Sequence, residues 1–219
     1  MLSHWAEWLP SLLEALVTSV TLTAGALAIG LPLGVLIAVA ATASRRSMRW
    51  LVIALVELGR GVPALILLYF MYFGLTQVRV SLTDTAAVMV ALGLNCAAYA
   101  SEVFRGAIEA IPHGQWDGAR AIGLSRRAVW TYVILPQMQR NAVPPTIGLS
   151  ILVFQTTSLA MTIGASDLMG VALNIGSLTF RYMSVIVLAA LLYAAVSIPA
   201  SQLATALQRR RDRLSAPSR

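Results

Sequence analysis

The segment Gly114-Gln115-Trp116-Asp117-Gly118-Ala119-Arg120-Ala121-Ile122-Gly123 is a polar stretch between two strongly apolar parts of the chain. A helix needs about 20 apolar residues to cross a membrane, and five stretches reach that length. The polar segment falls in the loop between the third and fourth stretches. The sequence therefore predicts an all-α membrane protein with five spans at residues 12–42, 50–75, 84–105, 142–165 and 182–207.

The composition supports this class. Of the 219 residues 58% are hydrophobic and only 11% are charged, with a mean hydropathy of +0.77, which leaves too little polar surface for a soluble domain. The single Cys96 cannot form a disulfide within the chain, and His4 and His113 lie too far apart to suggest a metal site. Because all 16 basic residues are arginine, the chain has no lysine for an ATP-binding P-loop.

The arginines predict the orientation in the membrane. They concentrate after the first, third and fifth spans, so the positive-inside rule puts the N-terminus outside and the C-terminus in the cytosol. The net charge of +7 is then explained by arginines that orient the protein in the membrane, and it does not indicate nucleic-acid binding. We expect the N-terminal helix to be retained and a short extra helix between residues 167 and 177. The arginines concerned are Arg45, Arg46, Arg49, Arg105, Arg120, Arg126, Arg127, Arg140, Arg209, Arg210, Arg211 and Arg213, with Arg79 and Arg181 in outer loops.

Polar residues inside the spans mark a candidate substrate path, since such residues usually face a cavity or a partner. In the second span Glu57 and Arg60 share a face and can pair, either to position helices or to line the path. In the third span Asn95, Tyr99 and Glu102 form one polar stripe, which can line a cavity or bond to neighbouring helices. Gly30 and Gly34 in the first span favour close helix packing.

The fourth span is expected to start with Pro144-Pro145 in its first turn, where proline is tolerated. At its middle it carries four consecutive polar residues, too many to hide on one helix face. These are the best candidates for substrate contact, although serine and threonine can also bond to the preceding turn. The four residues are Gln155, Thr156, Thr157 and Ser158.

The loop that contains the opening segment has the pattern of two short helices. Trp116, Ala119 and Ile122 predict one apolar face on the first helix, and Gly123 suits its left-handed C-terminal cap with Leu124 packing after it. Ser125 can cap a second helix, with Val129, Trp130 and Val133, that stops before Pro136. Two tryptophans and a tight turn favour a docking surface over a plain connector.

Four sequence blocks carry a resemblance to a known family. The chain resembles inner-membrane permeases of the polar amino-acid branch of binding-protein-dependent ABC importers. The first two blocks are Arg60-Gly61-Val62-Pro63 and Ala97-Ala98-Tyr99 through Glu102 to Arg105-Gly106. The other two are Gly114-Gln115 through Gly123 to Leu135-Pro136, and Thr157-Ser158-Leu159.

The resemblance implies a type I importer permease domain over residues 12–207, with a coupling loop at 106–140 and a basic cytosolic tail at 208–219. It implies a bacterial inner-membrane subunit that pairs with a second permease and does no covalent chemistry. Two cytosolic ATPases would bind ATP and Mg²⁺, and an extracytoplasmic binding protein would deliver the substrate. The implied ATPase contacts are Gln115, Trp116, Asp117, Gly118, Ala119, Arg120, Gly123, Leu135 and Pro136.

Two departures from the family pattern bear on function. The family's usual acid-Ala-Ala triplet is Asp117-Gly118-Ala119 here, and its basic residue before Thr-Ser-Leu is Gln155. Phe154-Gln155 is similar to acidic amino-acid permeases, which suggests a glutamate- or aspartate-like substrate. The alternatives are another small zwitterionic solute, a channel outside the ABC class, and an intramembrane enzyme. The last is disfavoured because neither histidine lies within a span.

Overall fold

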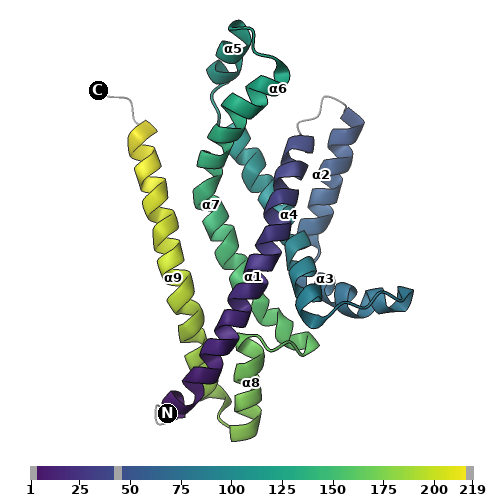
Figure 1. The fold of residues 1–219 in the computed structure, drawn as a ribbon, viewed down its shortest axis with the longest axis vertical. Helices are drawn as coiled ribbons and strands as arrows, with labels where there is room; N and C mark the ends of the chain where they lie inside the picture. The colour runs from purple at the N-terminus through teal and green to yellow at the C-terminus, as the bar shows by residue number, and fades with distance from the viewer. Residues whose placement is uncertain (1–3, 42–45, 216–219) are drawn as a thin grey trace.

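The structure, a computed structural model, describes residues 4–41 and 46–215, and all regular elements in these ranges are helical (Figure 1). Residues 64–78 form an unbroken series of short helices that is called the arm. In chain order the elements are α1 (Trp5–Ala41), α2 (Arg46–Gly61), α3 (Ala64–Tyr69), η2 (Phe70–Gly74), η3 (Leu75–Val78), α4 (Asp84–Glu109), α5 (His113–Ala121), α6 (Arg126–Ala128), η4 (Val129–Ile134), α7 (Leu135–Thr156), η5 (Thr157–Ile163), α8 (Leu168–Thr179) and α9 (Tyr182–Ser215).

Within the described residues, four helices are long and apolar enough to cross a membrane: Trp5–Ala41, Asp84–Glu109, Arg126–Ile163 and Tyr182–Arg209. The second predicted span is instead a bent pair, in which Arg49–Gly61 and Ala64–Val78 meet at 94°. The predicted count of five is reached only if this pair is one span. The bend follows from Pro63, which lacks an N–H and disfavours helical geometry in Val62.

The centre of the molecule is the pair α1 and α4, which lie against each other over much of their length (Figure 1). Glycines on α1 permit this approach. A Cβ on Gly34 would lie only 2.6 Å from that of Ala100, and one on Gly30 would lie 2.7 Å from that of Cys96. The prediction that Gly30 and Gly34 allow close packing is confirmed. Van der Waals contact at this seam is the main attraction available between helices in lipid.

The fourth span begins earlier than predicted. Pro144 and Pro145 lie inside α7 and not in its first turn. The second short helix of the loop does not stop before Pro136 either, because η4 runs directly into α7. The π-helical turn of η4 ends just before Pro136, which then occupies an early position of α7 where its missing N–H costs little. Helical structure thus continues from residue 126 to residue 163.

The predicted extra helix is present as α8. Its N-terminus is capped by Asp167, whose carboxylate accepts hydrogen bonds from the Met169 and Gly170 backbone N–H groups at 3.1 and 3.0 Å. α8 packs on α9 and α1. A second, smaller core forms there from Trp8, Leu12, Leu168, Ala172, Val185, Leu188 and Ala189.

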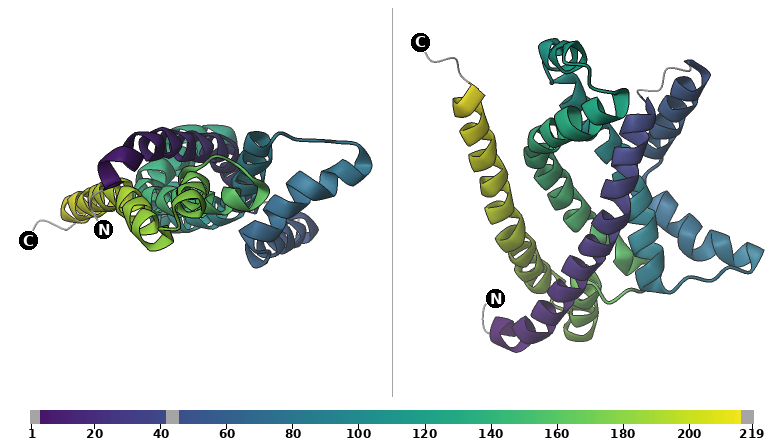
Figure 2. Two further views of the ribbon diagram at one scale, coloured as in Figure 1. Left: turned by 90° about the horizontal axis from the view of Figure 1, so that it is seen from below. Right: turned by 45° about the horizontal axis from the view of Figure 1, so that its top comes forward.

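The start of α1 and the end of α9 lie at opposite ends of the molecule (Figure 1). The end of α1, the start of α2, the loop around α5 and α6, and the end of α9 gather at one end, while α8 and the start of α1 lie at the other. All three basic regions of the sequence therefore share one end. The arm packs on α4 through α3 and η2, and its far end, η3, projects away from the remaining helices (Figure 2). Arg45 and the last four residues of the basic tail 208–219 fall outside the described residues.

Candidate functional site

The break between α2 and α3 exposes backbone groups that α4 partly satisfies. Asn95 donates from Nδ2 to the carbonyl oxygen of Gly59, and the Tyr99 hydroxyl donates to that of Arg60, both at 3.4 Å. These carbonyls lie at the end of α2, where a helix leaves its last acceptors without partners. The polar stripe of α4 therefore holds the broken helix in place.

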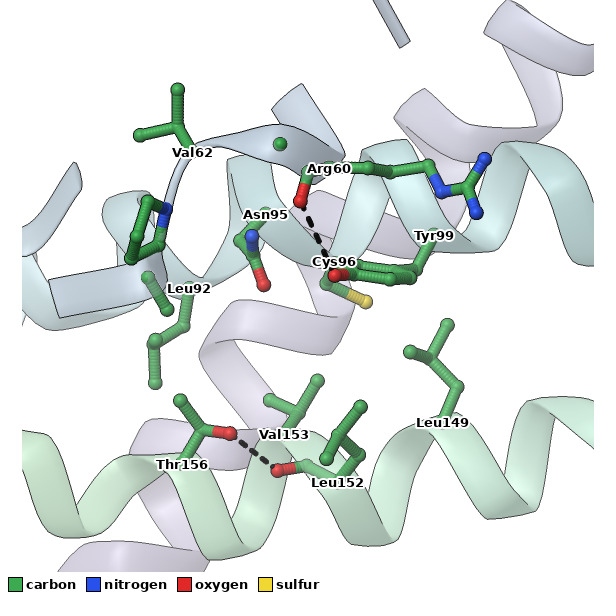
Figure 3. A pocket seen from close by; sticks show the side chains of 13 residues that line it. Arg60, Val62, Leu92, Asn95, Cys96, Tyr99, Leu149, Leu152, Val153 and Thr156 are labelled. Atoms are coloured by element: carbon green, nitrogen blue, oxygen red, sulfur yellow. Dashed lines mark hydrogen bonds between the residues drawn. The ribbon is translucent and has the colours of Figure 1, made fainter. Parts of the chain in front are cut away.

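A cavity of about 340 Å³ opens beside this break. Figure 3 shows that its walls come from the Arg60–Ala64 segment, from α4 and from the last turns of α7. Four polar or charged side chains face it among mostly apolar neighbours, an arrangement typical of small-molecule sites. The lining residues are Arg60, Asn95, Tyr99 and Thr156, together with Gly61, Val62, Pro63, Ala64, Leu92, Cys96, Leu149, Leu152 and Val153.

Arg60 is the one charged residue in this lining. Its guanidinium pairs with Glu57 at 3.2 Å, as the sequence predicted, and lies 5.7 Å from the centre of the Tyr99 ring. Glu57 is exposed and is not part of the lining. A cation over an aromatic face is favourable by about 0.5–2 kcal/mol. Both contacts orient the guanidinium beside the cavity.

Of the nine predicted path residues, the structure brings Asn95, Tyr99, Arg60 and Thr156 to the cavity. Glu102 instead pairs with Arg105 at 2.6 Å. The remaining members, Glu57, Gln155, Thr157 and Ser158, also lie outside the lining. Their part in a substrate path stays a prediction.

The end of α7 explains why the four consecutive polar residues separate. The α-helix stops at Thr156, and the tighter 3₁₀ geometry of η5 turns Thr157 and Ser158 to other directions. Thr157 is fully buried and donates to the Phe154 carbonyl at 2.7 Å, while Ser158 donates to that of Gln155 at 2.8 Å. Back-bonding to the preceding turn, the alternative given above, is what the structure shows for both.

A buried polar cluster near α8 was not predicted from the sequence. Asp167 is fully buried, and the Tyr193 hydroxyl donates to its carboxylate at 3.4 Å while also reaching Ser19 and Thr157. Burial raises the pKa of the Asp167 carboxyl. The available signal was an acidic residue directly before the apolar run from Leu168, which is a helix N-cap pattern. The cluster joins α1, η5, α8 and α9.

The second candidate site is the elbow, residues 113–134, comprising α5, α6 and η4. Gly123 has φ +79° and lies in the left-handed region, as predicted. The N–H groups of Gly123 and Leu124 donate to the carbonyls of Arg120 and Ala119 at 2.9 and 3.2 Å, which is the Schellman pattern. Ser125 caps the next helix by accepting from the Ala128 N–H, again as predicted.

The two tryptophans of the elbow contact each other. The rings of Trp116 and Trp130 meet edge to face with centroids 5.4 Å apart, and Ala119 is buried beneath them. Ile122, predicted on the same apolar face, is instead 76% exposed, so that part of the prediction is wrong. The left-handed turn begins right after Ile122 and leaves it outside the packed face.

The elbow offers a hollow and an exposed polar surface. The hollow, of about 600 Å³, is lined by Ile108, Trp116, Arg120, Leu124, Arg126, Val129 and Trp130. The Gln137 amide on α7 donates to Gln115 at 3.1 Å and ties the elbow to the membrane helix. Among the predicted ATPase contacts, those exposed are Gln115, Asp117, Gly118, Arg120, Gly123 and Pro136, while Trp116 and Leu135 are half-buried.

Comparisons with known proteins agree with this architecture. Residues 30–213 match the family "Binding-protein-dependent transport system inner membrane component". The chain is 34% identical to the probable amino-acid ABC transporter permease YckA of Bacillus subtilis, covering 76% of this chain and 74% of that protein. It is 31% identical to the arginine ABC transporter permease ArtQ of Escherichia coli K12, covering 82% and 86%.

A crystal structure of an amino acid ABC transporter with histidines superposes on this fold with a TM-score of 0.88. The sequence identity is 28%, and the match covers 96% of this chain and 98% of that one. Within residues 4–41 and 46–215, no group of three or more His, Cys, Asp or Glu side chains is placed to hold a metal ion. The chain belongs to the family of inner-membrane components of binding-protein-dependent transport systems, as a non-catalytic permease subunit of the amino-acid ABC transporter type.

Proposed function

We propose that this chain forms half of the translocation path of an ATP-driven importer for a polar amino acid. It pairs with a second permease, receives substrate from an extracytoplasmic binding protein and docks two cytosolic ATPase subunits, which bind ATP and Mg²⁺. The N-terminus lies outside and the elbow in the cytosol. The alternative substrate is another small zwitterionic solute.

One observation carries this proposal: the elbow and the cavity are built on the same continuous helical stretch, residues 126–163. Trp130 of the elbow stands near its start, and Leu149, Val153 and Thr156 line the cavity near its other end. At 1.5 Å per residue, Trp130 and Thr156 are about 39 Å apart along the helix. A helix of this length transmits a tilt of the elbow to the cavity wall, where the broken helix α2–α3 provides the opposing side.

The cavity chemistry favours a substrate with a carboxylate. Arg60 is the single charge in the lining, and within the described part of the chain no Asp or Glu faces the cavity. A guanidinium binds a carboxylate through paired hydrogen bonds, so a substrate carboxylate can take the place of Glu57, the exposed partner of Arg60 at 3.2 Å, whereas a cationic side chain beside Arg60 would be repelled. The geometry therefore supports a glutamate- or aspartate-like substrate over a cationic one.

Uptake competition tests the substrate class. Vesicles that contain the assembled transporter should take up labelled glutamate, and unlabelled aspartate should compete far better than arginine. Arg60→Gln should raise the half-saturating glutamate concentration roughly tenfold or more, since a hydrogen bond to a charged group is worth about 1.5–3 kcal/mol. Arg181→Gln, which removes an arginine outside the lining, is the matched control and should leave that concentration unchanged. Efficient competition by arginine would contradict the acidic-substrate proposal.

A further inference from the structure

An apolar groove of about 420 Å³ lies between α1, α2 and α4, separate from the cavity at the helix break. Every residue in its lining is Leu, Ile, Val, Ala or Gly. Val52, Val56 and Ala97 are buried along it, whereas Leu36 and Leu55 are 65% and 59% exposed. Because the groove belongs to membrane-spanning helices, it faces acyl chains or another protein, and water does not suit its lining.

The two ends of the groove differ in chemistry. At one end α2 touches α4, where a Cβ on Gly59 would lie 3.0 Å from that of Ala98. At the other end Arg49, seven residues before Val56, continues the groove-lining face of α2, and Arg46, three residues before Arg49, is its neighbour at the edge of that face. Both arginines are exposed, and the first turn of α2 contains no acidic residue. The candidate span begins at Arg49, which places this end at the membrane surface.

We propose that this groove binds an acyl chain of an anionic phospholipid whose phosphate is held by Arg46 and Arg49. The acyl chain alone gives little selectivity, because lipid tails are as apolar as the groove. The headgroup supplies the selectivity, since guanidinium groups form paired hydrogen bonds with phosphate oxygens. Basic pockets between membrane helices on the cytoplasmic side recognise such headgroups.

The charge at the groove mouth argues against a second copy of this chain as the occupant. In a two-fold symmetric interface across α2, Arg46 and Arg49 would approach the same arginines of the other copy at the same depth. Like charges in such an arrangement repel and oppose association. An anionic lipid instead neutralises both arginines while its tail fills the space between α1, α2 and α4.

Lipid titration followed by native mass spectrometry tests this site. The full-length chain, purified in detergent and stripped of lipid, is titrated with dioleoylphosphatidylglycerol and, separately, with dioleoylphosphatidylcholine. We expect one phosphatidylglycerol per chain to bind well before phosphatidylcholine does. Arg46→Gln/Arg49→Gln should raise the half-saturating phosphatidylglycerol concentration roughly thirtyfold, about fivefold for each arginine, as expected for one basic residue against an anionic headgroup.

Two further variants test whether lipid binding depends on the groove itself or only on the number of positive charges in the chain. Ala40→Phe fills the mouth of the groove while it keeps both arginines, so it should also lose the tight phosphatidylglycerol site. Arg209→Gln/Arg211→Gln removes the same charge from the end of α9 and should bind lipid as the wild type does. Unchanged affinity in the Arg46/Arg49 variant, or equal binding of both lipids by the wild type, overturns the proposal. So does disulfide crosslinking between chains through Leu55→Cys in a Cys96→Ala background, because the groove is then a protein interface.

Discussion

Single side chains near the cavity hold the backbone in place as well as line the site. Asn95 and Tyr99 donate hydrogen bonds to carbonyl oxygens at the end of α2. The polar stripe that the sequence predicted as a path lining therefore also stabilises the break between α2 and α3. The stripe was predictable because its residues recur on one helix face. The acceptors of its hydrogen bonds could not be predicted, because their positions depend on where α2 ends and the chain bends.

The buried carboxylate of Asp167 should stabilise the protein as the N-cap of α8. Asp167→Asn retains an acceptor that caps α8, whereas Asp167→Ala removes it and should cost about 1 kcal/mol. Thermal unfolding of the purified protein should therefore give a clearly lower Tm for the alanine variant only. A lowered Tm in both variants at neutral pH would show that the charge itself is needed.

The same residue predicts a pH dependence. Because burial raises the folded-state pKa of Asp167 above its ordinary value of 3.8, the folded protein binds this proton more readily than the unfolded chain. Its contribution to stability therefore falls as the pH rises from about 3.8 through the raised folded-state pKa. The Tm of Asp167→Asn should lack this part of the decline. Parallel pH profiles for wild type and variant would contradict the assignment.

At the scale of elements, the apolar stretches located the spans but not their ends or shape. Residues 12–41 of the first predicted span lie within α1, and residues 182–207 lie within α9, both continuous helices, while residue 42 falls outside the described residues. Pro144-Pro145 led to a wrong prediction for the start of the fourth span, because proline is usually found in the first turn of a helix. In α7 the two prolines lie inside the helix, where the surrounding helices accommodate them. The bend of 94° after α2 depends on tertiary contacts, since Pro63 alone predicts an interruption without its angle.

The seam between α1 and α4 predicts a difference between two glycines. At Gly34 an added Cβ meets the Ala100 Cβ at 2.6 Å and the Ser101 backbone at 3.1 Å, which cannot yield. At Gly25 it meets only the flexible end of Met89. Gly34→Ala should therefore lower the Tm by an amount equivalent to about 1–3 kcal/mol, and Gly25→Ala by much less. Equal effects would mean that the seam can open without cost.

The left-handed turn of the elbow gives a prediction about coupling. A β-branched residue at Gly123, where φ is +79°, costs about 1–2 kcal/mol and should distort the Schellman turn that holds α5 on η4. Gly123→Val should insert and fold normally yet lose co-purification of the ATPase or stimulation of hydrolysis by loaded binding protein. Gly148→Ala, a change at a helical glycine with open space around it, is the control. Normal coupling in the valine variant would make the elbow an ordinary loop.

For the whole molecule, the fold agrees with the arginine distribution, because the three basic regions gather at one end (Figure 1). With the bent pair counted as one span, the chain ends lie on opposite sides of the membrane. In a Cys96→Ala background, Glu7→Cys should react with an impermeant thiol reagent from outside and Gln208→Cys only after the membrane is opened. Labelling of both positions from one side would contradict an odd number of spans.

The elbow was the part of the molecule most open to prediction, because its caps and turn are local and leave residue-level signals at Gly123 and Ser125. The cavity was only partly predictable. The polar residues inside the spans predicted nine residues in the substrate path. The change from α-helix to 3₁₀-helix at the end of α7 turns Thr157 and Ser158 away from the cavity, and Glu102 pairs with Arg105 instead of lining it. The Glu102–Arg105 pair is local, since the two residues are three apart on α4, whereas the buried cluster around Asp167 arises from packing between segments that are distant in the sequence.

We propose that the helix from the elbow to the cavity couples ATP hydrolysis to substrate passage. Its most direct test is uptake into proteoliposomes that contain the permease with its ATPase partner, with and without ATP inside and binding protein outside. We expect accumulation of labelled glutamate only when all components are present, together with hydrolysis stimulated by loaded binding protein. Passage of substrate through the permease alone, or accumulation without ATP, would contradict it.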